Sequence, residues 1–442
     1  MNIQIIDNLT AARAHITRLR SREESALPES IKTRLRAIFG RDISPQDAVA
    51  QIVTDVRRNG DHALRDYTQR IDGVALDRFW AEAEHLETAY RAMSPALQDA
   101  LHLAADRIRA FHAQEPHQSW LNWADEGGAL GQMIRPIQRV GVYAPGGKAA
   151  YPSSLLMTAI PAQVAGVKDI LVTTPPGSQG SGSLPVLAAA YIAGLKRVLL
   201  LGGAQAIAAM AYGTASVPRV DKIFGAGNVF VTLAKKLVYG DVGIDGLYGP
   251  TETVLIADDT ANPTFAAADL LAQAEHDPLA TALLITPSAK FAKAVQTEVE
   301  RQIQFLERQT IIQESLPGQG ANLVAPDIEE ALQLANDYAP EHLCLLVKDP
   351  WAYIGKVRNA GGVFVGEVSS EALGDYVIGP SHVMPTNGTA RFASPLHLRD
   401  FLKVTSIFAV SDQTAQRLSA SAQTIARAEG LTAHAAAVAA RV

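Results

Sequence analysis

From about residue 135 the sequence repeats one pattern: a short run of β-branched residues ends at glycine or proline, and an Ala- and Leu-rich stretch follows. Such runs are typical of buried strands, and the stretches between them are long enough for helices. Strand and helix in alternation predict βαβ units, and hence an α/β protein with mainly parallel sheets. The runs span residues 140–143, 170–174, 198–201, 223–224, 254–257, 283–286, 343–347 and 363–365.

The chain length sets the expected number of domains. With 442 residues, of which 48% are hydrophobic, the chain is too long for one ordinary core. Chains of this length divide into about two or three domains. The runs before and after residue 250 therefore fit two α/β domains of similar design.

Charge, apolar runs and cysteine count narrow the class of protein. The 39 basic and 45 acidic residues are interspersed, so no polybasic block is present to neutralise a nucleic-acid backbone. No run of about 18 apolar residues occurs and the first residues mix charges with apolar side chains, so we expect a cytoplasmic protein. Cys344 is the single cysteine, which leaves His, carboxylate and amide groups as ligands for any metal.

Helical patterns are expected at both ends of the chain. Residues 1 to about 115 are predicted to be helical, and Ser44 followed by Pro45 is typical of a helix start. After about residue 397 the chain is again expected to be helical, and it is rich in alanine. Because such a tail buries little surface by itself, we expect it to pack on another domain or subunit.

Three glycine-rich turns follow strand-like runs, at residues 144–147, 202–205 and 225–228. Glycines there let the backbone approach a ligand, and the next helix N-terminus favours a phosphate. The adjacent Tyr143, Gln205 and Asn228 can supply a ring face and amide hydrogen bonds. No complete dinucleotide or phosphate-loop motif occurs, so the repetition of the turns indicates a nucleotide pocket and a purely structural role stays open.

Residues able to bind a metal occur in two places. Gln273 and His276 are three apart on a predicted helix, so both side chains project from one face, although a solvated helix end has the same spacing. Asp375 is expected in a Gly-flanked loop, where a carboxylate could reach a metal or simply form a turn. Nitrogen and oxygen ligands of these types suit Zn²⁺.

Glu341 and His342 are adjacent and precede the strand-like run 343–347. An imidazole suits abstraction of an alcohol proton, and a carboxylate suits activation of water. The pair is therefore a candidate for acid/base chemistry, and an exposed turn is the alternative.

Nine segments, taken in order, resemble the histidinol dehydrogenase family from about residue 40 to the C-terminus. They are VGVYAPGG, GGAQAIAA, GAGN, GPTETVLIAD, DLLAQAEHDP, NDYAPEHL, GDYVIGPSHVMPT, ARFASPL and EGLTAH. The resemblance implies one zinc ion per subunit, with Gln273, His276, Asp375 and His434 as its ligands. It also implies that Glu341 and His342 form the acid/base pair.

The same resemblance implies residues for the cofactor NAD and for the substrate. Tyr143, Gln205 and Asn228 would contact NAD. The substrate would be contacted by Thr251, His382 and Glu429, together with the four zinc ligands and His342. The family is a homodimer, and its C-terminal segment would carry Glu429 and His434 into the partner's site.

The implied fold is a pair of incomplete Rossmann-like domains with helical regions that intertwine in the dimer. Residues 1–36 would form an N-terminal helical region, and 397–442 a C-terminal helical tail that crosses to the partner. Residues 37–142 and 251–396 would form a discontinuous α/β domain with the metal and acid/base residues. Residues 143–250 would form the NAD-binding domain.

The implied reaction is a four-electron oxidation of L-histidinol, through L-histidinaldehyde, to L-histidine with two NAD⁺. His342 would take the hydroxyl proton and Glu341 would activate water on the aldehyde. Thr251 and Ala226 stand where the family usually has Ser and Pro, which bears on substrate identity more than on reaction class.

Three alternative functions stay open. A related zinc- and NAD-dependent dehydrogenase could act on another alcohol, such as a sulfonated diol. The presence of His382 and Glu429 argues against it, because a carboxylate suits a cationic substrate. An inactive metal- or nucleotide-binding protein would have lost Glu341 and His342. A metallohydrolase would not need the glycine-rich turns.

Overall fold

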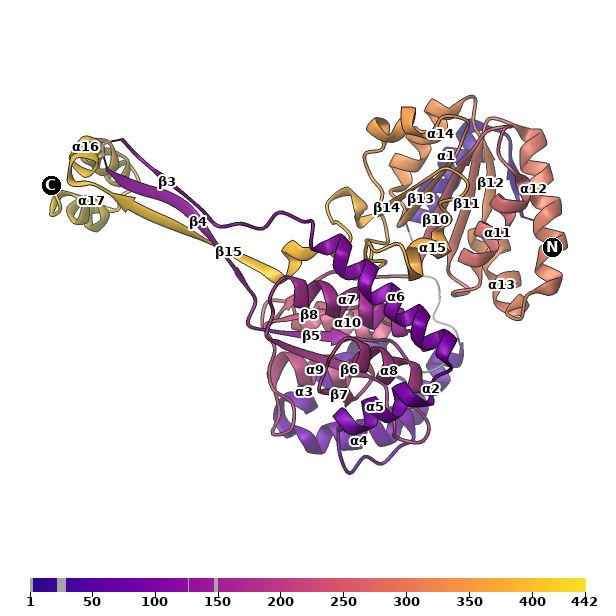
Figure 1. The fold of residues 1–442 in the computed structure, drawn as a ribbon, viewed down its shortest axis with the longest axis horizontal. Coiled ribbons are helices and arrows are strands. Elements are labelled where there is room, and N and C mark those ends of the chain that lie inside the picture. Colours follow the sequence, from indigo (N-terminus) through magenta and orange to yellow (C-terminus); the bar gives the residue numbers. More distant parts are fainter. Residues whose placement is uncertain (1–2, 22–28, 126, 147–149) are drawn as a thin grey trace.

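The computed structural model describes residues 3–21, 29–125, 127–146 and 150–442, and these form two α/β units and a long arm. Figure 1 shows the units in contact with each other, with the arm projecting from one of them to a pair of C-terminal helices. The two mainly parallel six-stranded sheets confirm the predicted α/β fold class.

The first sheet is parallel throughout, and we call it sheet A. Its order is β1-β12-β11-β10-β13-β14. The strands are β1 (Ile5–Ile6), β10 (Glu252–Ala257), β11 (Thr281–Thr286), β12 (Ala321–Val324), β13 (His342–Leu346) and β14 (Gly362–Val365). Every residue of β10 and β11 is buried, because helices cover both faces of the sheet.

The helices of sheet A form two hydrophobic cores. On one face lie α1 (Leu9–Ser21) and α14 (Ile328–Tyr338). The other face is covered by α11 (Pro263–Ala274), α12 (Ala289–Gln302) and α13 (Gln309–Gln319). The short helix α15 (Glu371–Tyr376) follows β14, and the 3₁₀ turns near this unit are Ile303–Phe305, Pro350–Lys356 and Thr389–Arg391.

The second sheet, sheet B, has the order β2-β7-β6-β5-β8-β9. Its strands are β2 (Trp80–Glu82), β5 (Arg139–Tyr143), β6 (Asp169–Thr174), β7 (Arg197–Leu200), β8 (Lys222–Phe224) and β9 (Gly243–Ile244). All neighbouring pairs are parallel except the edge pair of β2 and β7.

The helices between residues 29 and 238 surround sheet B. They are α2 (Glu29–Phe39), α3 (Pro45–Asn59), α4 (Asp61–Asp72), α5 (Ala83–Ala92), α6 (Pro95–His112), α7 (Pro152–Val164), α8 (Leu184–Ile192), α9 (Gly203–Tyr212) and α10 (Val229–Val238). Ser44 caps α3 as predicted, since its Oγ accepts a hydrogen bond from the Asp47 amide.

This packing differs from the expected grouping of residues 37–142 with 251–396. Helices α3 to α6 contribute to one core with β5, β6 and β7, and β2 pairs with β7. Strand β1 and helix α1 instead belong to sheet A. The apolar face of an amphipathic helix shows that the helix is buried, and it does not show which sheet buries it.

The arm is an antiparallel sheet of three strands, β3 (Trp120–Trp123), β4 (Gly128–Pro136) and β15 (Leu402–Val410). The 3₁₀ turn Leu398–Phe401 leads into it, and α16 (Asp412–Ala428) and α17 (Thr432–Ala439) form its far end (Figure 1). Residues 402–410 are thus a strand within the predicted helical tail, because all nine pair with residues 128–136 of β4.

The eight predicted strand runs are all confirmed, whereas several short strands were not predicted. Strands β1, β2, β9 and β12 have between two and four residues, too few to show a pattern. Among the described helices, none combines the length and the apolar character that a membrane crossing requires.

Candidate functional site

The candidate acid/base residues lie at the amino edge of sheet A. His342 is the first residue of β13 and Glu341 directly precedes it. In the neighbouring strand β10, Thr253 is paired with His342 in the parallel register, and Thr251 directly precedes the strand. The sheet register therefore brings the four side chains to adjacent positions.

Glu341 is buried and accepts two hydrogen bonds with one carboxylate oxygen. Its Oε2 is 2.5 Å from the donating hydroxyl of Thr251 and 3.2 Å from the amide nitrogen of Glu252. Burial raises the pKa of Glu341 well above its usual value, and the charges of Glu252 and Asp375 act in the same direction, while the Thr251 hydrogen bond opposes the rise. A raised pKa makes the ionised form of this carboxyl group a stronger base, as a proton-accepting role requires.

His342 is buried with its two ring nitrogens in different surroundings. Nδ1 lies 3.4 Å from Thr253 Oγ1 and 3.3 Å from Glu371 Oε1, whereas Nε2 lies 3.9 Å from Asp375 Oδ1. Within the described part of the chain, Nε2 has no hydrogen-bond partner. Burial lowers the pKa of His342 to about 4 although Asp375 raises it, so the imidazole is neutral at pH 7 and able to accept a proton.

Gln273 and His276 lie at the C-terminal end of α11, beside Thr251. The prediction places both residues on one face of a helix, but α11 ends at Ala274, two residues before His276. A turn follows, in which the His276 amide donates to the Gln273 carbonyl at 3.3 Å. Gln273 is fully buried, and its Oε1 lies 3.5 Å from Thr251 Oγ1. The Thr251 hydroxyl therefore lies between Gln273 and Glu341.

Asp375 and His382 connect sheet A with the unit of sheet B. Asp375 lies on α15 and not in a loop as expected, and its carbonyl accepts from His382 Nδ1 at 2.8 Å. His382 Nε2 is 3.0 Å from the hydroxyl of Ser154, near the start of α7. With a hydrogen on Nδ1 donated to the Asp375 carbonyl, Nε2 can accept from Ser154.

The two remaining predicted site residues lie at the end of the arm. His434 is part of α17 and Glu429 caps α16, and both side chains are exposed. Figure 1 shows these helices far from α11 and α15. One copy of the chain therefore does not bring His434 or Glu429 to the other candidate residues.

The predicted nucleotide contacts lie at the carboxyl edge of sheet B. Tyr143 ends β5, and its buried hydroxyl accepts from the Gly203 amide at 3.1 Å. Gln205 is fully buried in α9, with Nε2 3.5 Å from Asp72. Asn228 caps α10 by accepting from the amides of Phe230 and Val231. Of the predicted turn 144–147, only Gly147 lies outside the described residues.

A buried ion pair holds the turn before Asn228. Lys235 Nζ lies 2.5 Å from Asp245 Oδ1 and donates to the Gly225 carbonyl at 2.8 Å, and Asp245 Oδ2 accepts from the Gly225 amide. Gly225 has a φ of +109°, and a Cβ there would overlap the carbonyl oxygen of Tyr143. Glycine is therefore required where β5 and β8 end side by side.

The two edges differ in electrostatics. At the carboxyl edge of sheet B, helices α7, α9 and α10 begin, and helix N-termini favour anions. At the amino edge of sheet A, α11 ends, and helix C-termini favour cations. Within the described residues of one chain, no three His, Cys, Asp or Glu side chains form a group that could hold a metal.

Two polar residues of this edge were not found by sequence reasoning. Glu371 contacts both Thr253 and His342, and Thr253 is fully buried beneath them. The signal available was the spacing of Glu371 and Asp375, which are four apart in EALGDY and so share a helix face.

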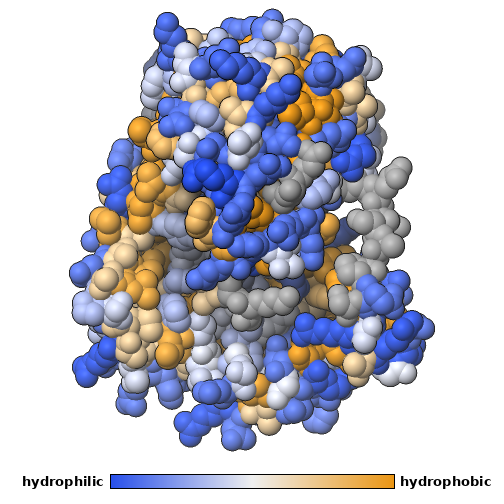
Figure 2. Space-filling model, turned by 90° about the vertical axis from the view of Figure 1, so that its right-hand side faces the viewer, coloured by the Kyte–Doolittle hydropathy of each residue, from blue (hydrophilic) through white to orange (hydrophobic). Residues whose placement is uncertain are grey.

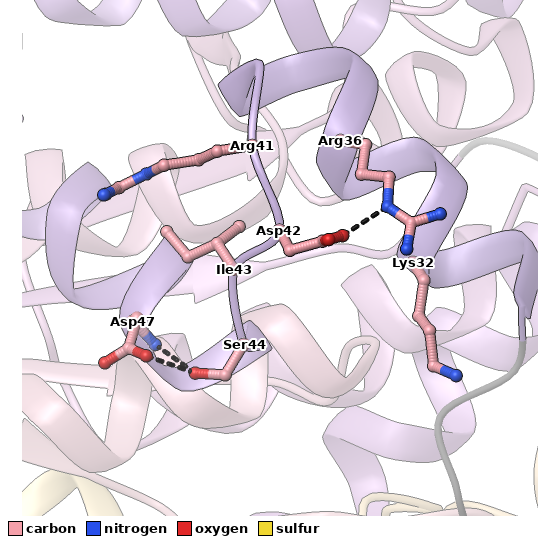
Figure 3. Close-up of a pocket in the computed structure, with 7 residues that line it drawn as sticks. All are labelled: Lys32, Arg36, Arg41, Asp42, Ile43, Ser44 and Asp47. Carbon is pink, nitrogen blue, oxygen red and sulfur yellow. Dashed lines mark hydrogen bonds and ion pairs between the residues drawn. The ribbon is translucent and has the colours of Figure 1, made fainter.

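A hollow of about 680 Å³ lies elsewhere in the unit of sheet B (Figure 3). It is lined by Lys32, Arg36, Arg41, Asp42, Ile43, Ser44 and Asp47. Arg36 pairs with Asp42, and Asp47 contacts Ser44, so several of its polar groups already have partners. None of the predicted site residues lines it.

Apolar surface is distributed unevenly over the molecule. On the face opposite the arm, hydrophilic side chains predominate and apolar ones form separate patches (Figure 2). On the arm, Trp123 is 72% exposed and Phe408 is 82% exposed. Leu130 pairs with Phe408 and is also exposed, and contiguous apolar patches of this kind mark surfaces that associate.

Comparisons with known proteins agree over nearly the whole chain. The family model described as histidinol dehydrogenase matches residues 40–442. A histidinol dehydrogenase of Deinococcus radiodurans is 52% identical over 98% of each chain, and one of a Synechococcus species is 46% identical over 98% of this chain and 97% of its own. The crystal structure of histidinol dehydrogenase from Elizabethkingia anophelis superposes with a TM-score of 0.90 at 35% identity, covering 99% of this chain and 98% of that one.

Proposed function

This chain belongs to the histidinol dehydrogenase family, and on that premise we propose that it oxidises L-histidinol through L-histidinaldehyde to L-histidine, with two NAD⁺ reduced. The observation that carries the proposal is the position of His342. Its neutral imidazole is buried among polar residues of the amino edge of sheet A, and Nε2 has no partner within the described chain. Burying a nitrogen without a hydrogen-bond partner costs free energy. A hydrogen bond from the substrate hydroxyl would offset this cost.

The residues near Nε2 fit a zinc ion in their chemistry. Gln273, His276 and Asp375 offer amide, imidazole and carboxylate donors at the negative end of α11. The Gln273 amide has a buried nitrogen without a partner among the described residues, as expected of a side chain whose surroundings are completed by another group. We propose these three residues as zinc ligands, with His434 of a second chain as the fourth.

The arm supports this sharing of ligands between chains. It carries His434 and Glu429 away from the body of its own chain, and it exposes Trp123 and Phe408. A second copy that packs on the arm would bury these side chains and receive His434 and Glu429 in its own site. We therefore propose a homodimer with two shared sites.

The carboxyl edge of sheet B is the proposed NAD site. Its helix N-termini suit a pyrophosphate, and the glycine turn at Gly225 lets a ligand approach the backbone. Tyr143, Gln205 and Asn228 are the proposed contacts. The Ser154–His382 hydrogen bond joins this edge to the amino edge of sheet A, so cofactor and substrate would meet there.

When bound, zinc would position the substrate nitrogens and NAD⁺ would accept hydride in each oxidation. In the first oxidation, His342 Nε2 would accept the hydroxyl proton of histidinol. In the second, Glu341 would remove a proton from the water that adds to the aldehyde, with the Thr251 hydroxyl holding its carboxylate. His382, Thr251 and Glu429 of the partner are the proposed substrate contacts.

The test counts NADH formed per L-histidinol consumed by the zinc-loaded protein. The expected ratio is two, lost on chelation and restored by zinc. A ratio of one would contradict the second oxidation. Turnover of a different alcohol, without turnover of histidinol, would show that the substrate is that alcohol. The shared site is tested by mixing inactive His342→Asn and His434→Ala proteins. Partial recovery of activity is expected only if one site combines residues of two chains.

A further inference from the structure

The buried carboxylate of Glu371 has no part in the chemistry described so far, although it lies against the imidazole that does. Glu371 begins α15, and its side chain is buried. Its Oε1 is 3.3 Å from His342 Nδ1 and its Oε2 accepts the hydroxyl hydrogen of Thr253 at 2.5 Å. Burying a carboxylate is unfavourable, so its presence calls for a specific use.

Helix α15 brings two carboxylates to one ring. Glu371 and Asp375 are four residues apart and share a helix face, and they lie near Nδ1 and Nε2 of His342 respectively. Gly374 makes this approach possible, because a Cβ at that position would lie 2.5 Å from the ring of Phe364. Phe364 in turn meets the His342 ring edge to face, with centroids 5.7 Å apart.

The hydrogen bonds around Nδ1 determine which nitrogen of His342 carries the hydrogen. The single hydroxyl hydrogen of Thr253 is donated to Glu371, so Thr253 Oγ1 presents lone pairs to Nδ1. Glu371 Oε1 lies 3.3 Å from Nδ1, and as a carboxylate it has no hydrogen to donate, although burial raises the pKa of Glu371 well above its usual value. Because both neighbours of Nδ1 are acceptors, the hydrogen of the neutral ring lies on Nδ1 and the lone pair lies on Nε2.

We propose that Glu371 is a positioning residue that holds His342 in the tautomer with a free Nε2, and that Thr253 orients Glu371 for this task. The proposal rests on the proposed function, in which Nε2 accepts the hydroxyl proton of the substrate. When that proton arrives, the ring becomes a cation, and the carboxylate at Nδ1 stabilises it. Glu371 itself neither contacts the substrate nor moves a proton.

The test replaces Glu371 by Gln, which keeps the size of the side chain and offers a donor to Nδ1. We expect kcat for histidinol oxidation to fall roughly 10- to 100-fold, the effect typical of losing a group that orients a site imidazole. The KM for histidinol and the zinc content should stay unchanged. Asp258→Asn is the control, because Asp258 is a partly buried carboxylate that follows the opposite end of β10 and has no proposed role, and its kcat should match the wild type.

A spectroscopic measurement tests the same assignment without any substrate. In protein labelled with [¹⁵N]histidine, the His342 signals, identified by their absence in His342→Asn, should report hydrogen on Nδ1. In Glu371→Gln this tautomer should be lost or mixed. An unchanged tautomer with unchanged kcat would overturn the proposal, as would a loss of kcat that follows loss of zinc or of folded protein.

Thr253 provides a second pair of variants in case Glu371→Gln does not fold. Thr253→Val removes the hydroxyl and keeps the shape, and it should lower kcat roughly 3- to 10-fold, as expected for one hydrogen bond, while Thr253→Ser should restore it. Equal activity of both variants would contradict the role of the hydroxyl. A wild-type enzyme that makes no NADH from histidinol would instead contradict the proposed function, whatever the tautomer of His342.

Discussion

The two six-stranded sheets use opposite edges, and the chemistry of the side chains differs accordingly. Sheet B presents its carboxyl edge, where backbone amides, glycines and helix N-termini predominate. Sheet A presents its amino edge, where Glu341, His342 and the end of α11 lie. The first arrangement suits an anionic cofactor, and the second suits a metal ion and proton transfer. The choice of edge, more than the fold of each unit, separates the two tasks.

This division would be broken by a variant of one edge that affects the function of the other. The largest expected effect comes from His342→Asn, which removes the proposed base. We expect kcat with histidinol to fall about 10²- to 10⁴-fold, the usual contribution of a positioned base, with the KM for NAD⁺ unchanged. Asn228→Ala, at the other edge, should raise the KM for NAD⁺ and spare kcat. Steady-state kinetics with both substrates varied would measure these constants. A changed KM for NAD⁺ in His342→Asn, or a lowered kcat in Asn228→Ala, would contradict the division.

The second prediction concerns stability instead of catalysis. It tests the buried ion pair of Lys235 and Asp245, which holds the turn at Gly225 beside sheet B. Lys235→Met leaves Asp245 buried without its cation, and we expect the free energy of unfolding to fall by about 3–5 kcal/mol. Lys236→Met is the control, since Lys236 is exposed and its loss should change stability by less than about 0.5 kcal/mol. Denaturant unfolding measures both. Similar values for the two variants would contradict the importance of the buried pair.

Removal of zinc should act on the amino edge of sheet A and leave the carboxyl edge of sheet B unaffected. Zinc at 100 times its dissociation constant stabilises the folded state by about 2.7 kcal/mol, so chelation should lower the thermal midpoint. Calorimetric titration of the chelated protein should show that NAD⁺ binding is retained and histidinol binding is lost. Loss of NAD⁺ binding to the same degree would show that the two edges are not independent.

Two glycines allow a matched comparison of the edges at smaller magnitude. Gly225→Ala would force a side chain against Tyr143, and Gly374→Ala would force one against Phe364. Each should cost about 1–3 kcal/mol, as overpacking typically does. The first should appear in the KM for NAD⁺ and the second in kcat with histidinol. Gly318→Ala is the control, because no neighbouring atom lies within 4 Å of a Cβ there.

The strands of both sheets were predictable because each carries a local signal. A buried parallel strand is a continuous run of apolar residues, and β5, β10 and β13 are all of this kind. The arm was not predictable in the same way. Strand β15 is exposed along much of its length and is stabilised by pairing with β4, which is distant in the sequence.

The site was predictable in its chemistry but not in its assembly. Glu341 and His342 share a sequence segment, and the structure brings Gln273, His276 and Asp375 into their neighbourhood through the register of β10 and β13. The only local signal for Glu371 is its four-residue spacing from Asp375, and that signal is weak because a glutamate at the start of a short helix usually faces solvent. Its role depends on Thr253, more than a hundred residues away. The places proposed for His434 and Glu429 stay a prediction that needs a second chain.

The arm also has a consequence during protein synthesis. Strand β15 emerges from the ribosome more than 260 residues after β4, the strand with which it pairs. At the usual rate of 5–20 residues per second, the hairpin of β3 and β4 waits roughly ten seconds to a minute for its third strand. Trp120 and Trp123 are exposed even in the finished arm, so the nascent chain presents them throughout this interval. The order of synthesis therefore leaves this hairpin without its third strand for most of the time that the chain is being made.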